Sequence, residues 1–150
     1  MANVRYAKPG WLTRNVFNRA VVLLTRAGLN FWGSQILQVR GRKTGDVRET
    51  PVNLLTYGRG RYLVAPRGQT QWVRNLRAAG GGALRLGRGT ERFRAVEIRN
   101  EDKPEILRTY LRRWKAEVGV FFGGVGAESS EEELLRIAPN HPVFRIEPTP

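Results

Sequence analysis

Apolar residues occur along this chain in short runs separated by glycine-rich turns, a pattern typical of β-hairpins. Gly58-Arg59-Gly60 and Gly87-Arg88-Gly89 each join two such runs. Pro51 lies near the start of one run, where its missing amide is tolerated at a sheet edge. We therefore predict about six mainly antiparallel strands, at Ile36–Val39, Glu49–Tyr57, Arg61–Ala65, Ala83–Leu86, Thr90–Ile98 and Val143–Ile146.

Helical spacing of apolar residues marks the segments between and after these strands. Thr70, Asp102 and Ser130 are each placed to act as an N-cap, and Gly80-Gly81-Gly82 ends the first of the three helices. The predicted helices are Thr70–Ala79, Lys103–Val118 and Glu131–Ala138. A chain of 150 residues with strands in hairpins and helices outside predicts one α+β domain, a small β-barrel covered by helices over residues 36–148.

The N-terminal segment 1–28 contains a fourth amphipathic helix, Trp11–Ala27, with basic residues on its polar side. Such a helix either packs against the domain or covers the mouth of the barrel, which is the commoner case, or it lies on an anionic membrane surface. Arg14, Arg19 and Arg26 interrupt its apolar run, so we expect neither a signal peptide nor a membrane span. The expected location is the cytoplasm, with peripheral membrane contact through this helix as the alternative.

The positive charge is concentrated in the first two-thirds of the chain. Residues 1–99 carry 19 Lys and Arg against four acids, a net of +15, whereas residues 100–150 have a net of −2. A polyanionic small molecule, a membrane surface or nucleic acid would suit this field. Aromatic residues do not interleave with the basic ones as in nucleic-acid grooves, so no nucleic-acid partner is expected. Because the chain has no cysteine and one histidine, we expect no metal site.

The loop within Gln38–Pro51 is the sharpest local signal. It holds four cations, Arg40, Arg42, Lys43 and Arg48, beside Gly41 and Gly45. Cations next to glycines that let a ligand approach the backbone form a seat for a multiply charged anion. The alternative is a solvated hairpin loop with ordinary surface charge, and the residues alone do not separate the two.

A second cluster follows Pro66-Arg67-Gly68 at the start of a predicted helix. Gly68 and the helix N-terminus, next to Arg67, can receive an anionic or carbonyl oxygen. Trp72 offers a flat surface and Asn75 both a donor and an acceptor. The alternative is that Trp72 and Leu76 form the buried face of the helix.

No catalytic nucleophile is indicated. Ser34, Ser129 and Ser130 have no acid–histidine context, and His141, beside Pro142, is expected to be structural. The catalytic residues therefore stay unassigned. If the protein is an enzyme, we expect a bound cofactor to carry out the chemical step and the protein to orient it.

The order of the motifs resembles the deazaflavin-dependent nitroreductase family, split β-barrel oxidoreductases of actinobacteria that use coenzyme F420. The similar motifs are Gly41-Arg42-Lys43-Thr44-Gly45 with Arg48, Thr50 and Pro51, then Tyr62–Gly68, then Trp72-x-x-Asn75-Leu76. The similarity runs from about Ile36 to Ile98 and more loosely through Pro142–Pro148.

This resemblance implies an F420-dependent reductase that passes a hydride to an activated acceptor, an enone, a quinone or a nitro compound. The coenzyme's phosphodiester and oligoglutamate tail would be held by Arg42, Lys43, Thr44, Arg48, Glu49, Thr50 and Pro51. Val64, Ala65, Pro66 and Arg67 would line the deazaflavin ring, and Gln71, Trp72, Val73, Arg74 and Asn75 would form its wall. The alternatives are a non-catalytic carrier of F420 or of a fatty acid on the same fold, and a reductase that binds FMN.

The chain departs from the family pattern where some members have a tyrosine-rich substrate segment. Here Trp114, Phe121 and Phe122 either form an apolar acceptor pocket or simply close the barrel. The partner is thus a small-molecule hydride acceptor, and the protein is expected to be a monomer or a homodimer.

Overall fold

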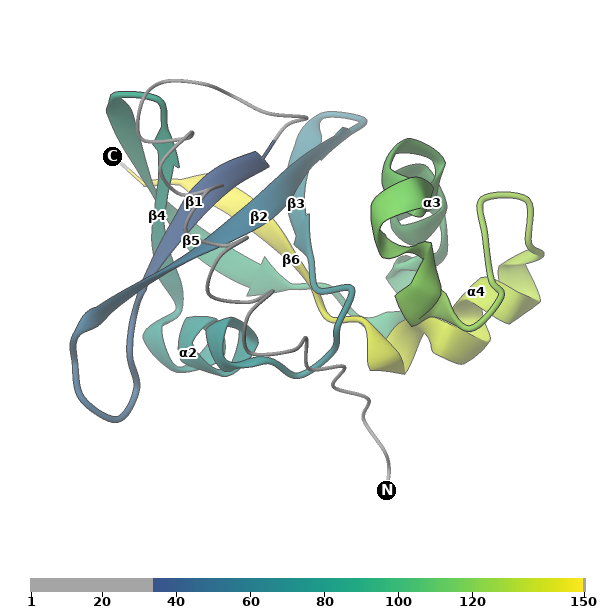
Figure 1. The fold of residues 1–150 in the computed structure, drawn as a ribbon, viewed down its shortest axis with the longest axis horizontal. Helices are drawn as coiled ribbons and strands as arrows, with labels where there is room; N and C mark the ends of the chain where they lie inside the picture. The colour runs from purple at the N-terminus through teal and green to yellow at the C-terminus, as the bar shows by residue number, and fades with distance from the viewer. Residues whose placement is uncertain (1–33, 150) are drawn as a thin grey trace.

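Six antiparallel strands close into a barrel in the computed structural model, which describes residues 34–149 (Figure 1). Their order around the barrel is β1-β2-β3-β6-β5-β4. The predicted α+β barrel is confirmed, while the predicted helix Trp11–Ala27 lies outside the described residues. The strands are β1 (Ser34–Arg40), β2 (Val47–Tyr57), β3 (Gly60–Val64), β4 (Gly81–Leu86), β5 (Gly89–Glu97) and β6 (Val143–Pro148).

Three local hairpins and three long-range ladders close the barrel. The tight turns after β2 and β4 are those predicted, with Gly58 at φ 59° and Gly87 at φ 60°. Closure itself requires β1 to pair with β4, and β6 to pair with both β3 and β5. Pro51 pairs with Ile36 of β1, in the part of β2 that lies before its pairing with β3 begins at Leu54. Its missing amide thus falls where β2 has a partner on one side only.

The helices cover two different parts of the barrel (Figure 1). Helix α2 (Gln71–Ala79) lies across one end of the barrel and contacts β1, β4 and β5, whereas α3 (Pro104–Val118) and α4 (Glu131–Ile137) stand beside it. Within residues 34–149, no helix is long and apolar enough to cross a membrane. Three short 3₁₀ turns complete the described chain, η1 (Asn100–Asp102), η2 (Gly119–Phe122) and η3 (Ala138–Asn140).

The helix starts and ends differ from the sequence predictions in two places. Asp102 is not the N-cap of α3, because it belongs to η1, and Lys103 takes the N-cap position instead. Gly80 ends α2 with φ 77° as expected, but Gly81 and Gly82 open strand β4. Ser130, by contrast, caps α4 in a complete capping box with Glu133.

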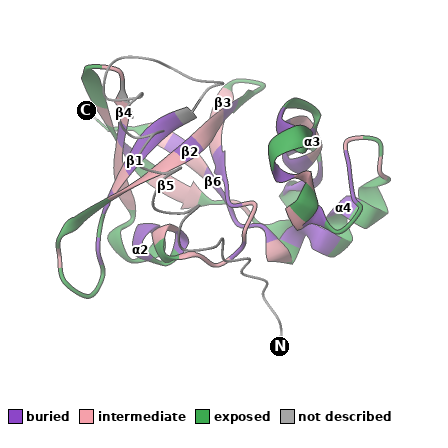
Figure 2. Ribbon diagram, in the orientation of Figure 1, coloured by how far each residue is buried: buried purple, intermediate pink, exposed green. Residues whose placement is uncertain are grey.

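The core has two parts, which share the barrel wall (Figure 2). One fills the barrel and includes Val73 and Leu76 from α2, so this helix plugs its end. The other lies between the outer face of the barrel and the helices beside it, and joins Leu55 and Val143 to cluster members of α3 and α4. Burying both faces of the same strands ties α2 and α3 to one scaffold. That scaffold fixes where the β1–β2 loop and the segment after β3 stand.

Candidate functional site

The β1–β2 loop has a fixed backbone that presents its cations to solvent. Gly41 donates to the carbonyl of Asp46 at 2.7 Å, and Gly45 donates back to the carbonyl of Gly41 at 2.9 Å. The side chains of Arg42 and Lys43 at the tip are exposed. A Cβ at Gly41 would lie 3.1 Å from the Asp46 carbonyl oxygen, so the turn leaves little room for a side chain there.

Arg42 is anchored to helix α2. Its backbone N–H donates to Asn75 Oδ1 at 3.1 Å, and its Nη1 donates to the same oxygen at 2.7 Å and to Gln71 Oε1 at 3.0 Å. Asn75 is only 5% exposed, so its amide oxygen is a buried acceptor for the loop. Both partners, Asn75 and Gln71, are neutral amides, so these hydrogen bonds do not neutralise the charge of the guanidinium. The structure thus brings together two clusters that are 33 residues apart in the sequence.

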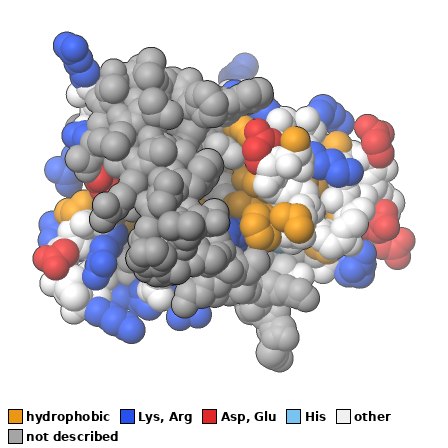
Figure 3. All heavy atoms as spheres, in the orientation of Figure 1, with side chains coloured by type: hydrophobic (Ala, Val, Ile, Leu, Met, Phe, Trp, Pro, Cys, Tyr) orange, Lys and Arg blue, Asp and Glu red, His pale blue; other side chains and the backbone are white. Residues whose placement is uncertain are grey.

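The other predicted tail residues follow directly along β2. Arg48 is exposed opposite Val39, and Thr50 is half-buried opposite Leu37. Glu49 accepts a hydrogen bond from Gln38 Nε2 at 2.7 Å. Lys and Arg side chains gather around the end of the molecule where this loop and α2 lie, on the face seen in Figure 3. The loop and the start of β2 thus expose Arg42, Lys43 and Arg48, with the acids Asp46 and Glu49 among them, and their role as an anion seat stays a prediction.

The segment after β3 runs past the start of α2. Val64 and Ala65 are 4% and 1% exposed, and their side chains lie in the two cores. Gly68, at φ 90°, donates to the Ala65 carbonyl at 3.2 Å and closes a turn. This segment can therefore offer a ligand its backbone and the half-buried side chains of Pro66 and Arg67.

Helix α2 places its predicted wall residues on two sides. Trp72 is half-buried and tilts against Phe144 with ring centroids 6.2 Å apart, so it serves partly as core. Val73 is fully buried, whereas Gln71 and Arg74 are exposed. The far end of the helix is held by Arg77, whose paired hydrogen bonds to Glu97, at 2.7 and 2.8 Å, raise the pKa of Arg77.

Thr70 occupies the N-cap position of α2 as predicted, but its side chain accepts no capping hydrogen bond. Its Oγ1 is buried and has no hydrogen-bond partner among the described residues. A buried hydroxyl costs free energy unless a partner reaches it, so this oxygen is a candidate contact for a bound ligand.

The three predicted acceptor-side aromatic residues occupy different positions. Trp114 and Phe122 are each 1% exposed, inside the core beside the barrel. Phe121 is half-buried, and the guanidinium of Arg67 lies 5.9 Å from the centre of its ring. Phe121 is therefore the one of these three that faces the segment after β3.

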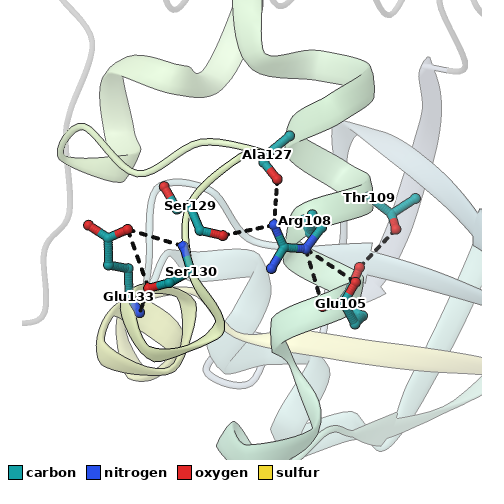
Figure 4. Close-up of polar contacts among 7 residues, drawn as sticks. All are labelled: Glu105, Arg108, Thr109, Ala127, Ser129, Ser130 and Glu133. Atoms are coloured by element: carbon teal, nitrogen blue, oxygen red, sulfur yellow. Dashed lines mark hydrogen bonds and ion pairs between the residues drawn. The ribbon is translucent and has the colours of Figure 1, made fainter.

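The loop that follows Phe121 and Phe122 is held by a polar cluster on α3 (Figure 4). Arg108 Nη1 donates to the carbonyls of Ala127 at 2.6 Å and Ser129 at 2.8 Å. Its Nε donates to the carboxylate of Glu105 at 3.2 Å. Arg108 therefore ties residues 127–129 of this loop to α3.

Sequence reasoning missed one contact in this region. His141, expected to be structural, is 4% exposed, and its Nδ1 lies 3.0 Å from the carbonyl oxygen of Pro66 in the predicted ring-lining segment. A histidine beside Pro142 at a strand start gives no local sign of this partner. Only the long-range pairing of β3 with β6 brings the two together.

A family model described as F420H(2)-dependent quinone reductase matches residues 13–123. No curated protein sequence matches the chain.

Solved structures of the same fold have low sequence identity to the chain. An F420-H2 dependent reductase (FDR-A) is 16% identical with a TM-score of 0.53, over 77% of this chain and 94% of that one. A protein described as a domain-swapped dimer is also 16% identical, with a TM-score of 0.55 over 91% and 99% of the two chains. A putative 5-nitroimidazole antibiotic resistance protein from Bacteroides thetaiotaomicron is 11% identical, with a TM-score of 0.51 over 89% and 79%.

Proposed function

The chain belongs to the F420H(2)-dependent quinone reductase family, and on this premise we propose that it reduces an activated acceptor, a quinone, an enone or a nitro compound. Coenzyme F420 is the family's cofactor, and in its bound, reduced form it supplies the hydride. The family is one of reductases, which favours turnover over the alternative of a carrier protein and F420 over FMN.

The donor set on the barrel edge fits this coenzyme. Its phosphodiester and oligoglutamate tail need several cations in a row, and the strip of Arg42, Lys43 and Arg48 supplies them. The observation that carries the proposal is the double anchor of Arg42 on Asn75, at 2.7 and 3.1 Å. This anchor aligns a preformed cation with the start of α2, which reduces the ordering cost of binding a polyanion.

The chain's own residues would then position the ring end. Arg42, Lys43, Thr44 and Arg48 to Pro51 hold the phosphate and tail in this proposal. The backbone of Val64–Arg67 lies along the ring, and the helix segment Gln71–Asn75 forms its wall, with Val73 behind it in the barrel core. The buried Thr70 Oγ1 is a further contact in the same place. The residues contribute proximity, orientation and exclusion of water rather than a nucleophile.

Phe121 forms the acceptor side in this proposal, because it is the half-exposed aromatic residue next to Arg67. Trp114 and Phe122 would support it from the core. Arg67 stands between the proposed ring segment and Phe121, where a guanidinium can polarise an acceptor oxygen.

The proposal is tested with the purified protein, reduced F420 and one acceptor of each class, namely a naphthoquinone, a cyclohexenone and a nitroaromatic compound. We expect acceptor-dependent reoxidation of the coenzyme, followed by its returning fluorescence. Absence of turnover with all three classes would contradict the proposed reaction. A titration with oxidised F420 tests binding separately, and absence of binding at micromolar coenzyme would contradict the cofactor assignment as well.

The location of the tail is tested by the double variant Lys43→Ala/Arg48→Ala. Losing two charge-assisted contacts should weaken F420 binding by about tenfold or more at low salt, and the difference should shrink as salt rises. The matched control is Arg59→Ala/Arg88→Ala, two exposed cations in the turns after β2 and β4. Equal losses in both double variants would mean that general charge, and not this loop, binds the coenzyme.

The assembly state proposed is a monomer or a homodimer, and the domain-swapped dimer among the similar structures supports the second. The mass in solution, measured by light scattering, distinguishes them.

A further inference from the structure

His141 is the only histidine in the chain, and it lies between the two walls of the proposed site. Its ring is buried at the start of β6, and its Nδ1 is 3.0 Å from the Pro66 carbonyl oxygen. The next residue, Pro142, accepts a hydrogen bond from the Ala65 backbone N–H at 2.8 Å. Residues 141 and 142 thus extend the β3–β6 ladder beyond its last pair, Val64 with Val143.

The contact with Pro66 fixes a peptide plane. Proline has no N–H, so its carbonyl is the only polar backbone group through which residue 66 can be held. The described chain has no cis peptide bond, and in a trans peptide the C=O and the following N–H point in opposite directions. Holding the Pro66 carbonyl toward His141 therefore turns the N–H of Arg67 away from it.

The imidazole ring of His141 also contacts the part of the site that we propose faces the hydride acceptor. It stacks on Phe122 with centroids 4.0 Å apart and planes 13° from parallel. Phe122 is the chain neighbour of Phe121, whose ring lies against the guanidinium of Arg67. One imidazole thus contacts both the segment proposed to line the deazaflavin and the turn proposed to face the acceptor.

We propose that His141 is a positioning residue, which holds the Pro66–Arg67 peptide and Phe122 in the relative placement that hydride transfer needs. This inference rests on the proposed function. Because a carbonyl oxygen can only accept, His141 must carry its proton on Nδ1. The role therefore requires a proton on Nδ1, which can be observed without any activity assay.

The first test is the long-range ¹H–¹⁵N spectrum of the unmodified protein, in which a single histidine needs no assignment. We expect a proton on Nδ1, and a change in the ring signals as oxidised F420 is added. A ring protonated on Nε2 alone, or signals that do not move at saturating F420, would overturn the inference even if every variant failed to fold.

The second test separates the hydrogen bond from the stacking. His141→Phe keeps a ring against Phe122 but has no donor, whereas His141→Asn keeps a donor near the Nδ1 position without the ring. We expect single-turnover hydride transfer to be about tenfold or more slower in His141→Phe, and within about threefold of the unmodified rate in His141→Asn. F420 affinity should change by less than about threefold in both, because the tail contacts lie elsewhere.

Rescue by asparagine is the outcome that a merely structural role would not produce, because His141→Asn loses more packing than His141→Phe. Unchanged transfer in His141→Phe, or equal slowing in both variants, would overturn the positioning role. If the unmodified protein neither binds F420 nor turns over, the proposed function fails instead, and the tautomer still reports whether the Pro66 contact exists.

Discussion

Asn75 shows how one side chain links two segments of the candidate site. A buried amide oxygen that accepts two hydrogen bonds from Arg42 is costly to remove, because the Arg42 backbone N–H loses its partner and Nη1 loses one of its two acceptors. The sequence indicated Asn75 as a donor and acceptor for a ligand, but it could not reveal that the acceptor is used within the protein. That use depends on a loop 33 residues away.

We expect Asn75→Ala to lower the free energy of unfolding by about 1–3 kcal/mol and to weaken F420 binding. Denaturant unfolding and the fluorescence titration measure the two effects. Gln71→Ala is the matched control on the same helix, because its exposed side chain gives Arg42 only one contact, at 3.0 Å. A larger effect for Gln71→Ala than for Asn75→Ala would contradict the anchoring role.

Lys103 is a buried cation at the start of α3. It is 3% exposed, and its Nζ donates to the Ala138 carbonyl at 2.9 Å. Burial lowers the pKa of Lys103 from 10.5 to about 8, although nearby Glu97 opposes this change. Between these two pKa values the unfolded chain binds the proton more tightly than the folded one, so stability rises with pH in this window.

We expect the unmodified protein to gain about 3 kcal/mol of stability relative to Lys103→Met between about pH 7.5 and 10.5. Taking the difference between the two proteins removes the contribution of the other titrating groups. Urea unfolding at several pH values measures it. A difference that is flat, or that falls with rising pH, would show that the folded state does not depress the pKa of Lys103.

At the level of the elements, the close approach of β4 to β1 and β5 depends on Gly81 and Gly82. A Cβ on Gly82 would lie 2.5 Å from the Gln38 carbonyl oxygen of β1, a backbone atom that cannot move without opening the barrel. Gly82 also pairs with Phe93 on its other side. Its lack of a side chain is therefore a condition of barrel closure.

Gly82→Ala should destabilise the protein by about 2–3 kcal/mol or more, because it forces two paired backbones apart. The control is Gly119→Ala at the end of α3, where φ is −56° and the new Cβ would approach only the flexible Lys115 side chain. That variant should be neutral or slightly stabilising. Thermal unfolding compares the two, and equal melting temperatures would contradict the role given to Gly82.

The elements that the sequence predicted well are those with local causes. The turn glycines, the alternation within hairpins and the cap at Ser130 act over a few residues, and all were predicted near their places. The predictions for the Gly80-Gly81-Gly82 run and for the N-cap of α3 were wrong for a different reason. Gly82 is needed because the backbone of β1 approaches it closely, and Asp102 is part of the 3₁₀ turn η1, so Lys103 takes the N-cap position of α3.

The residues of the candidate site also fall into two groups, those visible in the local sequence and those placed by long-range contacts. The cations and glycines of the β1–β2 loop are visible in the sequence because they are neighbours. The contact of His141 with Pro66, which spans 75 residues, is not, because the ladder that creates it joins distant strands.

In the molecule as a whole, the two cores share the strands between them. Leu55, Val64 and Val143 face the helices from the barrel's outer side, while Leu63 and Phe144 on neighbouring positions face its interior. Tyr110 of α3 adds a buried hydrogen bond with Asn53 of β2, and burial raises the pKa of this tyrosine. Since both layers bury the same sheet, loss of either layer exposes apolar surface on the other.

Leu107 lies fully buried in the core between α3 and the barrel, so Leu107→Ala should cost about 2–5 kcal/mol. Val120→Ala is the control, because that side chain is 83% exposed and should change stability by less than about 0.5 kcal/mol.

The shared sheet further predicts that the helices and the barrel of Leu107→Ala still unfold together. Far-ultraviolet circular dichroism follows the helices, and hydrogen exchange at the amides of β4 and β5 follows the barrel. Helices that melt at a lower denaturant concentration than the barrel would mean that the two cores are energetically separate. In that case Phe121 and Phe122 would move independently of the segment after β3, and a site assembled from both layers would lose its structural basis.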